Sequence, residues 1–468
     1  MTANELLDNA APRIVPPLDP GFRPAILAHE AYRSAVKGNN DKSRAVIALE
    51  SSGGAVYRHE FDIMPCCNSV DEATRLYIGK LAKFLLWSRG GWKIHFAGSA
   101  KAGKLIRAQY SADGERAFDA ELMSRVYERD FEVDIVEEER IPSGKEGSVS
   151  LGGNLDGCRI GFDLGASDYK LAAVHDGKPV FTTEIPWNPK DEPDPAYHYS
   201  RIQKGLKLAA EHLPRVDAIG GSSAGVYVDN RPMVASLFRS VPRDRFESEV
   251  KPMFLRIAEE WKVPLTIIND GDVTALAGAM SLGENGMLGI AMGSSEAAGF
   301  LRKNGKIAGW LNELAFAPVD FNPEGPPDEW SGDLGVGAMY FSQQAVNRLA
   351  PAAGTGFPEE MPLPERLKLV QELADNNDKN AAAVFETIGV YLGYTIPWYA
   401  EFYDYDNLLV LGRVTSGKGG EILVEKAREV LKKEFPETAE RITVHVPDEK
   451  SRRVGQAVAA ASLPVTAG

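Results

Sequence analysis

The sequence predicts a protein of two or three α/β domains whose sheets mix parallel and antiparallel strands. The chain has 468 residues, which is more than a single hydrophobic core usually accommodates. Its 44% of apolar and 25% of charged residues are typical of globular proteins. Strand and helix patterns alternate along most of the chain, and glycine turns join some consecutive strands into hairpins, which indicates mixed sheets.

Composition excludes several classes of partner. The net charge of −14 argues against nucleic acid, which is bound by basic surfaces. Three cysteines, Cys66, Cys67 and Cys158, are too few for a disulfide framework and suit a reducing compartment. The sequence contains neither a leader-like pattern in residues 1–42 nor an apolar run near 18 residues. We therefore expect a cytoplasmic protein that binds neither nucleic acid nor a membrane.

The first third of the chain predicts an arm followed by a small separate domain. Residues 1–42 are rich in proline and predict an extended arm with one short helix from Pro24 to Val36. Residues 43–150 predict an α/β domain that begins with a hairpin and contains an amphipathic helix from Val70 to Trp87. The stretch from 141 to 157 is rich in glycine and serine and predicts a linker.

The strand pattern restarts at Arg159, and its first strand ends in an aspartate before a glycine turn. Gly165, Ser167 and Lys170 follow Asp163. Glycine lets the backbone approach a polyphosphate, and an aspartate can hold Mg²⁺ through water. The alternative interpretation is a hairpin turn with a solvated aspartate.

Asp270 follows the apolar segment from Pro264 to Asn269, which predicts a buried strand that delivers the carboxylate to a cleft. A hydroxyl that attacks a phosphoryl group must lose its proton, and a positioned carboxylate can accept it. Asn269 can exchange hydrogen bonds with sugar hydroxyls. A helix cap is the alternative role for this Asn-Asp pair, and the two roles are compatible.

Two later loops have the small residues expected around phosphates and nucleotides. Gly293, Ser294 and Ser295 follow an apolar strand and predict a second phosphate turn, with a plain hairpin as the alternative. The glycine-rich turn that includes Gly412, Ser416 and Gly417 predicts a nucleotide cradle. By contrast, the P-loop-like run at 98–105 has Leu105 where magnesium binding requires serine or threonine, which argues against a phosphate site there.

In this order and spacing, the loops over residues 159–420 resemble the ROK family of sugar kinases and repressors, within the actin-like, hexokinase-like ATPase superfamily. Asn312–Asp320 is similar to the family's Glu-x-Gly-His segment and the Pro-Val-Asp after it, and Ala224-Gly225 resembles its Gly-x-Pro-Gly turn. The resemblance implies two ribonuclease-H-like lobes, 158–268 and 269–468, with residues 43–150 as an additional N-terminal α/β domain.

The resemblance also implies a function and a set of site residues. It implies an ATP- and Mg²⁺-dependent kinase for a sugar or sugar-like polyol, with Asp270 as the general base and Asp163 at the metal. Substrate contacts are expected from Asn269, Glu313, Ala224 and Gly225. Nucleotide contacts are expected from Asp163, Gly165, Ser167, Lys170, Gly293, Ser294, Ser295, Gly412, Ser416 and Gly417.

The sequence departs from the family pattern at several positions. Phe316 stands where the family has a histidine, and Ala338-Met339 stand where a second sugar-binding glutamate is expected. The segment 328–337 replaces the cysteine-rich zinc motif, so we expect no zinc. Glu296 in the second phosphate loop is expected to bring a carboxylate near anionic phosphate.

Two other functions stay open at this level: a catalytically silent sugar-binding regulator on the same fold, and a phosphotransferase with a non-sugar substrate. The family's repressors carry a basic helix-turn-helix, whereas residues 1–150 are nearly charge-balanced and contain strands, which argues against DNA binding. The sequence leaves open whether this part caps the cleft, enlarges the substrate site or forms an interface, such as that of a homodimer.

Overall fold

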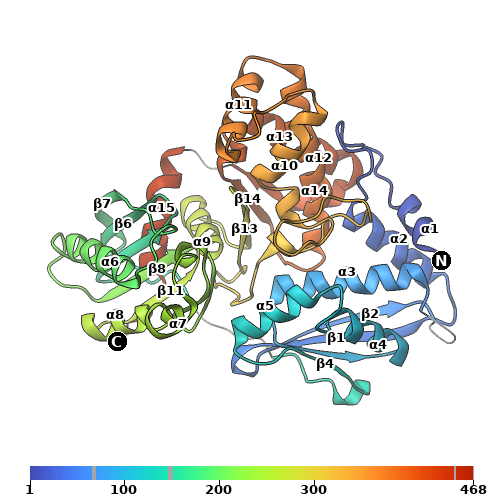
Figure 1. The fold of residues 1–468 in the computed structure, drawn as a ribbon, viewed down its shortest axis with the longest axis horizontal. Helices are drawn as coiled ribbons and strands as arrows, with labels where there is room; N and C mark the ends of the chain where they lie inside the picture. The colour runs from blue at the N-terminus through green and yellow to red at the C-terminus, as the bar shows by residue number, and fades with distance from the viewer. Residues whose placement is uncertain (66–69, 146–150, 447–448, 467–468) are drawn as a thin grey trace.

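The computed structural model describes residues 1–65, 70–145, 151–446 and 449–466, without the side chains of 449–454. The chain forms three α/β regions, two of which lie on either side of helix α9 (Asp270–Leu282) (Figure 1). We call them the N-terminal region (1–145), lobe 1 (158–269 with the C-terminal helix) and lobe 2 (287–446). In the part of the chain that the structure describes, none of the helices meets the length and apolarity needed to span a membrane.

The N-terminal region is a four-stranded sheet covered by helices. The strand order is β2-β1-β3-β4, with β1 antiparallel to both neighbours and β3 parallel to β4. Its elements are α1 (Ala3–Asn9), α2 (Ala25–Lys37), β1 (Ser43–Glu50), η1 (Ser52–Gly54), β2 (Val56–Ile63), α3 (Glu72–Arg89), β3 (Lys93–Ala97), α4 (Ala100–Gln109), α5 (Ala117–Tyr127), β4 (Glu132–Ile135) and η2 (Glu138–Arg140).

Residues 1–42 do not form an extended arm. They contain α1 and α2, whose apolar side chains, such as Leu6 and Ile26, are buried. Between the helices, Phe22 packs edge-on against Tyr391 of lobe 2 at 4.7 Å between ring centroids. The prolines that suggested an arm lie in this connection, where Phe22 is in the core and Ile14 and Leu18 pack against it.

The N-terminal region and lobe 2 share one hydrophobic core, so residues 43–150 do not form the separate domain that was expected. Helix α3 lies between the N-terminal sheet and lobe 2 and is buried on nearly all sides, from Ala73 to Arg89. A helix that is covered all round must have packing partners on every face. Removing this region would therefore expose the core of lobe 2.

Lobe 1 has a five-stranded mixed sheet in the order β11-β8-β5-β6-β7. Strands β5, β6 and β7 form an antiparallel meander, and β5, β8 and β11 are parallel. Its elements are β5 (Cys158–Leu164), β6 (Asp168–His175), β7 (Lys178–Pro186), α6 (Pro195–Ala210), β8 (Ala218–Ser223), β9 (Val226–Val228), β10 (Arg231–Val234), η3 (Ser236–Phe238), α7 (Arg243–Arg245), η4 (Phe246–Val250), α8 (Met253–Trp261) and β11 (Leu265–Asn269).

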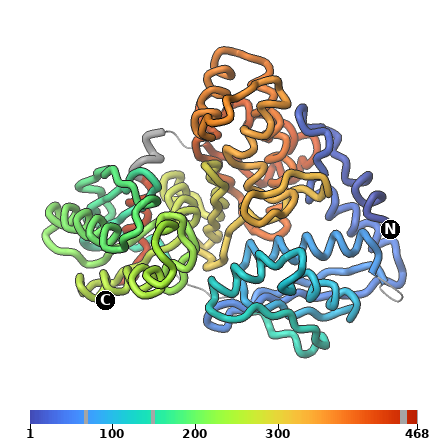
Figure 2. Tube along the Cα trace, viewed as in Figure 1, coloured from blue at the N-terminus to red at the C-terminus, as the bar shows by residue number. Residues whose placement is uncertain are grey.

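The C-terminal helix α15 (Glu449–Ala461) packs on the sheet of lobe 1, although the expected boundary placed it in lobe 2. Figure 2 shows this red segment beside the green part of the chain. Two glycines explain the close packing. A Cβ on Gly161 would lie 1.7 Å from the Ala457 carbonyl oxygen, and one on Gly220 would lie 1.6 Å from that of Ala460. The backbone of α15 can approach the sheet this closely only because the two glycines have no side chain.

Lobe 2 repeats the pattern of lobe 1, a hairpin followed by a parallel strand. Its sheet has the order β13-β12-β14-β15, with β12 antiparallel to β13 and parallel to β14. Its elements are β12 (Met287–Met292), β13 (Glu296–Leu301), η5 (Leu314–Phe316), η6 (Gly337–Met339), α10 (Gln343–Ala352), α11 (Leu363–Asp375), α12 (Lys379–Ala400), β14 (Asn407–Leu411), η7 (Arg413–Thr415), α13 (Gly417–Glu434), α14 (Pro436–Arg441) and β15 (Thr443–His445).

Candidate functional site

Asp163 lies near the end of β5, and its carboxylate is held from two sides. Ser222, on the neighbouring strand β8, donates a hydrogen bond of 2.8 Å to Oδ1, and Lys170 Nζ donates one of 3.2 Å to Oδ2. Burial by itself lowers the pKa of Lys170, but the surrounding carboxylates, Asp163 first among them, outweigh this effect and raise it. The Lys170 ammonium is therefore a stable positive charge beside Asp163.

The turn after Asp163 is a tight hairpin that requires glycine. The Gly165 amide donates to the Asp168 carbonyl at 2.9 Å, and the Trp187 indole donates to the Gly165 carbonyl at 2.8 Å. A Cβ on Gly165 would lie 2.7 Å from the Asp168 carbonyl oxygen. Ser167 is exposed on this turn, with its hydroxyl donating to Asp168 at 3.0 Å. The turn thus presents a fixed backbone and a hydroxyl at the surface of lobe 1.

Asn269 joins two predicted substrate segments. It caps α9 by accepting a 2.7 Å hydrogen bond from the Gly271 amide, and its amide group donates to the Gly225 carbonyl at 2.8 Å. Gly225 has a φ of 121°, and a Cβ there would lie 2.3 Å from the Val234 carbonyl oxygen. The Ala224-Gly225 turn is thereby fixed to the start of α9, and the Asn269 amide keeps one N–H and one lone pair for a ligand.

Asp270 is the first residue of α9 and lies close to Asp163. Burial raises the pKa of Asp270 to about 6, and the negative charge of Asp163 adds to the increase. No side chain in the described ranges donates a hydrogen bond to this partly exposed carboxylate. A carboxylate with a pKa close to neutrality and no side-chain partner can accept a proton from a bound hydroxyl.

The segment that carries Glu313 is fixed by the end of helix α3. The amides of Leu311, Asn312 and Glu313 donate to the carbonyls of Arg89, Ser88 and Trp87 at 3.3, 3.1 and 3.0 Å. The last carbonyls of a helix have no partner within the helix, so this segment satisfies them. The N-terminal region therefore positions a predicted substrate residue directly.

The charges of Glu313 and Asp270 influence each other. Burial raises the pKa of Glu313 to about 8, and the charges of Asp270 and Asp272 raise it further. At neutral pH its carboxyl group is mostly protonated and can donate a hydrogen bond to an acceptor oxygen. Glu313 and Asp270 thus present one donor and one acceptor in the same neighbourhood.

Arg89, at the end of α3, is a structural residue that the sequence pattern did not reveal. Its guanidinium is 3.7 Å from the ring centroid of Trp310 and 4.5 Å from that of Tyr403, and it donates to the Phe402 carbonyl. A buried cation between aromatic faces is favourable because each ring carries negative potential over its face. Only the spatial arrangement shows this role, because these residues are far apart in the sequence.

The second phosphate turn and the nucleotide turn lie beside each other in lobe 2. Gly412 has a φ of 107°, and a Cβ there would lie 2.4 Å from the carbonyl oxygen of Met292, the residue before Gly293. Ser294 and Ser295 are exposed. Ser416 and Gly417 line a cavity of about 470 Å³ together with the start of α13, and among the side chains that the structure describes none from lobe 1 lines it.

The structure thus brings the predicted residues together in two groups. Asp163, Asn269 and Gly225 lie at or just after the carboxyl ends of three neighbouring parallel strands of lobe 1, with Asp270 and Glu313 beside them. The residues at 293–295 and 412–417 form the second group, at the carboxyl ends of the parallel strands β12 and β14 in lobe 2. Carboxyl ends of strands are the usual ligand-binding edges of such sheets.

Glu296 does not point toward the phosphate turn as expected. Its side chain is buried, and it accepts a hydrogen bond of 3.4 Å from the Tyr399 hydroxyl inside lobe 2. As the first residue of β13 it has the inward-facing position of the strand, which explains the orientation. The carboxylate is therefore in the interior, near Glu313.

The residues around Asp163 suit Mg²⁺ held mainly by phosphates and water. Asp163 offers a single carboxylate, which fits the preference of Mg²⁺ for one or two carboxylates plus substrate oxygens. Among the described residues there is no cluster of three His, Cys, Asp or Glu side chains that could hold a metal. Cys66 and Cys67 lie outside the described ranges, and Cys158 is a buried free thiol.

The segment 328–337, which replaces the zinc motif, is held by ion pairs to the N-terminal region. Asp333 accepts a 2.5 Å hydrogen bond from Lys83 and another from Arg116. Lys83 also bonds both carboxylate oxygens of Asp119 at 2.7 and 2.8 Å. Buried charges compensate one another here, and they connect α3 and α5 to this segment.

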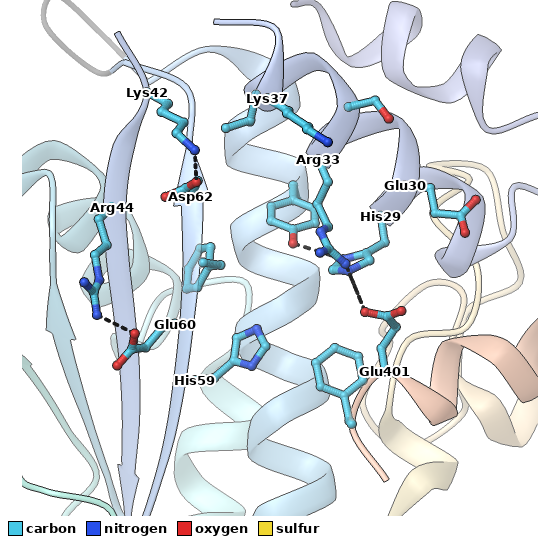
Figure 3. Close-up of a pocket in the computed structure, with 15 residues that line it drawn as sticks. His29, Glu30, Arg33, Lys37, Lys42, Arg44, His59, Glu60, Asp62 and Glu401 are labelled. Carbon is cyan, nitrogen blue, oxygen red and sulfur yellow. Dashed lines mark hydrogen bonds and ion pairs between the residues drawn. The ribbon is translucent and has the colours of Figure 1, made fainter. Parts of the chain in front are cut away.

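A groove of about 950 Å³ lies between α2, β2 and the end of α12 (Figure 3). Aromatic side chains such as Phe61 and Phe402 contribute to its lining, and ion pairs occupy its rim, including Lys42–Asp62 at 2.6 Å and Arg33–Glu401 at 3.0 Å. None of the predicted site residues lines it. We therefore do not assign the phosphotransfer site to this groove.

No protein-family model matches the sequence, and no curated protein matches it significantly. Among solved structures, a ROK family transcriptional regulator, a homologue of the E. coli MLC protein, is 18% identical with a TM-score of 0.54 and covers 66% of this chain and 78% of its own. A ROK family glucokinase from Streptomyces griseus, in complex with glucose and AMPPNP, is 20% identical (TM-score 0.49; 65% of this chain, 99% of its own). A ROK hexokinase from Thermus thermophilus is 17% identical (TM-score 0.48; 65% and 97%).

The likeness to the regulator is a likeness of fold, over about two thirds of the chain. It confirms the predicted two-lobed architecture and the resemblance derived from the motif order. The N-terminal sheet and its helices form an additional α/β region built against lobe 2. Over about two thirds of the chain, the two lobes of this protein therefore share the fold of this ROK family regulator.

Proposed function

We propose that the protein is an ATP-dependent kinase that phosphorylates a hydroxyl group of a sugar or sugar-like polyol. The observation that carries the proposal is the carboxylate of Asp270, at the N-terminus of α9 beside Asp163, with a pKa of about 6 and no side-chain hydrogen bond in the described structure. A group of this kind is ionised at neutral pH and close enough in pKa to take a proton from a reacting hydroxyl.

The proposed reaction transfers one phosphoryl group and one proton. Bound Mg·ATP supplies the phosphoryl group and leaves as ADP. The substrate hydroxyl forms the new O–P bond as its O–H bond breaks, and Asp270 accepts the proton. Asn269, held by Gly225 and Gly271, and Glu313, held by the end of α3, orient the other hydroxyls.

Nucleotide binding is proposed for the turns of both lobes. The exposed turns at 165–167 and 293–295 offer backbone N–H groups and hydroxyls to phosphate oxygens. Lys170 adds a positive charge beside Asp163, where magnesium is proposed. The cavity lined by Ser416 and Gly417 is proposed to take the nucleoside. Closure of the two lobes would exclude water, so that the substrate hydroxyl attacks instead.

One observation favours a second candidate, a catalytically silent sugar-binding regulator. Phe316 stacks on Trp87 at 4.3 Å between ring centroids, so the position where the family has a histidine belongs to an aromatic cluster. If the protein is such a regulator, Asp270 and Glu313 bind the sugar, and sugar binding rather than sugar phosphorylation is the function.

A coupled assay of ADP release tests the proposal against a panel of neutral sugars, polyols and sugar acids in the presence of ATP and Mg²⁺. Asp270→Asn serves as the control for background hydrolysis. Substrate-dependent release that the variant loses supports the kinase. Sugar binding in calorimetry without any ADP release supports the regulator, and the absence of both overturns the assignment to a sugar.

A further inference from the structure

The N-terminal region contacts lobe 1 as well as lobe 2, and the two contacts differ in character. With lobe 2 it shares an apolar core. Toward lobe 1, Glu128 at the end of α5 accepts a 2.8 Å hydrogen bond from Lys251, and its carboxylate lies 3.5 Å from the Arg231 guanidinium. Figure 1 shows α5 on the side of the N-terminal region that faces lobe 1. The boundary between these two parts is therefore polar, as interfaces between domains often are.

A cavity of about 420 Å³ lies at this boundary. The N-terminal region lines it with the turn 51–54 between β1 and β2, with Trp92 and with the end of α5. Lobe 1 lines it with the hairpin of β9 and β10, including Asp229. Because one wall belongs to the N-terminal region, the two lobes alone would not form this cavity.

On the side of lobe 1, the chain leads directly from the proposed substrate site to the cavity. Strand β9 begins after Gly225, whose carbonyl accepts the hydrogen bond of 2.8 Å from Asn269. Asp229, at the tip of the hairpin, is four residues farther along, a reach of roughly 13 Å for an extended strand. The hairpin thus connects the turn beside Asn269 with the cavity.

On the side of the N-terminal region, a single glycine separates the cavity from the segment of Glu313. Tyr127 lines the cavity, and a Cβ on Gly90 would clash with its hydroxyl. The same Cβ would lie 3.1 Å from the Cβ of Leu311, which is two residues before Glu313. The cavity therefore adjoins both segments that carry the proposed substrate contacts.

The side chains that line the cavity suit a polyhydroxylated ligand. The Arg129 guanidinium lies over the Trp92 ring, 4.8 Å from its centroid. Among the described residues, Arg129 has no ion pair, and the Asp229 carboxylate has neither an ion pair nor a side-chain hydrogen bond. Arg129 thus offers only donors and Asp229 only acceptors, while Ser51 and Ser52 add hydroxyls that do both. Each sugar hydroxyl both donates and accepts, so this combination is complementary to several of them.

The charges of the lining disfavour a nucleotide or a sugar phosphate. Carboxylates outnumber guanidinium groups among the described lining residues, which include Glu50, Glu128, Asp229, Arg129 and Arg231. A phosphate group would therefore gain no net attraction from this cavity.

We propose that the cavity is a second substrate subsite, which binds the next sugar unit of an oligosaccharide or glycoside whose terminal unit lies at Asp270. This inference rests on the proposed function and adds the size of the substrate, which is more than one sugar unit. Arg129 and Asp229 are then specificity-determining residues. The N-terminal region enlarges the substrate site, because it supplies one wall of the second subsite.

Three variants test the subsite, two of them with a matched control. Asp229→Gly removes the carboxylate at a residue with a φ of 50°, and Lys262→Gly, with a φ of 54° on the same lobe, is its control. Arg129→Gln removes the guanidinium, and Arg125→Gln, at an exposed residue of α5 that does not line the cavity, is its control. Ser52→Trp fills the cavity from an exposed turn.

Calorimetry compares glucose with maltose and cellobiose, and N-acetylglucosamine with chitobiose, while thermal unfolding is followed in parallel. The wild type is expected to bind at least one disaccharide about tenfold more tightly than its monosaccharide, the scale of one or two added hydrogen bonds. Asp229→Gly and Arg129→Gln are each expected to remove most of this gain and to leave monosaccharide affinity within about twofold. Ser52→Trp is expected to abolish the gain, and the two controls are expected to match the wild type.

Equal affinity for every disaccharide and its monosaccharide would overturn the inference, and so would variants that weaken both sugars equally. If Ser52→Trp does not fold, Asp229→Gly and Arg129→Gln decide. A disaccharide preference that depends on Arg129 and Asp229 but gives no ADP release would contradict the kinase and keep the subsite. ADP release with a monosaccharide as good a substrate as every disaccharide would keep the kinase and contradict the subsite.

Discussion

Asn312 donates a hydrogen bond of 2.9 Å to the carboxylate of Asp272, and so connects the segment of Glu313 to the helix of Asp270. The Phe300 amide donates to the same oxygen at 3.1 Å, and the Tyr403 hydroxyl donates to Asn312 at 3.1 Å. Burial raises the pKa of Asp272 to about 7, and the hydrogen bonds from Phe300 and Asn312 oppose this increase by stabilising the carboxylate. The segments that carry Asp270 and Glu313, the two carboxyl groups proposed to face the substrate, are therefore connected by one buried hydrogen-bond network.

Asn312→Gly is expected to lower the free energy of unfolding by about 1–3 kcal/mol, because it removes a donor from a buried carboxylate. Glycine is chosen because Asn312 has a φ of 52°, which alanine would strain. Lys262→Gly, at an exposed residue with a φ of 54°, is the matched control. Denaturant unfolding that gives equal stabilities for the two variants would refute the role of the Asn312–Asp272 bond.

Asp333→Asn is expected to lower the free energy of unfolding by about 3–5 kcal/mol, the usual cost of removing one partner from a buried ion pair. Lys83, with 1% of its side chain exposed, would then keep its ion pair with Asp119, and Arg116 would lose its ion pair with Asp333. Asp62→Asn removes the exposed pair with Lys42 and is expected to change stability by at most about 1 kcal/mol. Equal effects of Asp333→Asn and Asp62→Asn would contradict a structural role for this ion-pair network.

Elemental analysis is expected to find no stoichiometric zinc in the purified protein.

Deletion of the chain up to Gly153 is expected to give insoluble protein or protein with no cooperative thermal transition. The reason is that lobe 2 shares its core with the N-terminal region and that the end of α3 fixes residues 311–313. Solubility, calorimetric unfolding and ADP release would be compared with the full chain. A folded and fully active truncated protein would show that this region is an accessory.

Local patterns were sufficient to predict the strand that ends at Asn269, the helix that begins at Asp270 and the glycine turns, because each depends on neighbouring residues. The packing of α15 on lobe 1 and the burial of α1 and α2 could not be predicted in this way. They depend on contacts between residues hundreds of positions apart, and a short helix has the same periodicity whichever sheet it covers.

The same distinction applies to the site. Asp163, Asn269 and Asp270 were predicted because each ends or follows a strand, but Arg89 and Asn312 act only through partners from other segments. The inward orientation of Glu296 followed from its register in β13, which the loop motif concealed. Every residue of β13 except Ala297 is buried, and the sequence itself, one glutamate followed by small and apolar residues, contains no alternation from which this could be predicted.

The rate of phosphoryl transfer is expected to depend on pH with a maximum near neutrality. Asp270 must be ionised, so the rate should rise with pH through its pKa of about 6. If protonated Glu313 orients the substrate, the rate should fall again through its pKa of about 8. A rate that is flat from pH 5 to pH 9 with saturating substrate would contradict both assignments.

The free energy of unfolding is expected to fall as the pH rises, without a maximum near neutrality. The folded chain holds protons on Asp270, Glu296 and Glu313 that the unfolded chain releases near pH 4 to 4.5, so stability should fall as the pH rises from there through about 8. Glu296→Gln should reduce this fall, whereas Glu284→Gln, at an exposed residue, should not. Unfolding free energies at pH 5, 6.5 and 8 provide the comparison.

The kcat of Asp270→Asn, measured by ADP release with saturating ATP and the best neutral sugar or polyol of the panel, is the most direct test of the proposed kinase. The substitution preserves the size of the side chain and removes its basicity, so kcat is expected to fall at least about 10²-fold, the scale of lost general-base catalysis. Sugar affinity, measured separately by calorimetry, is expected to stay within about threefold of the wild type, since Asn269 and Glu313 remain in place. A kcat near that of the wild type would contradict the assignment of Asp270 as the base.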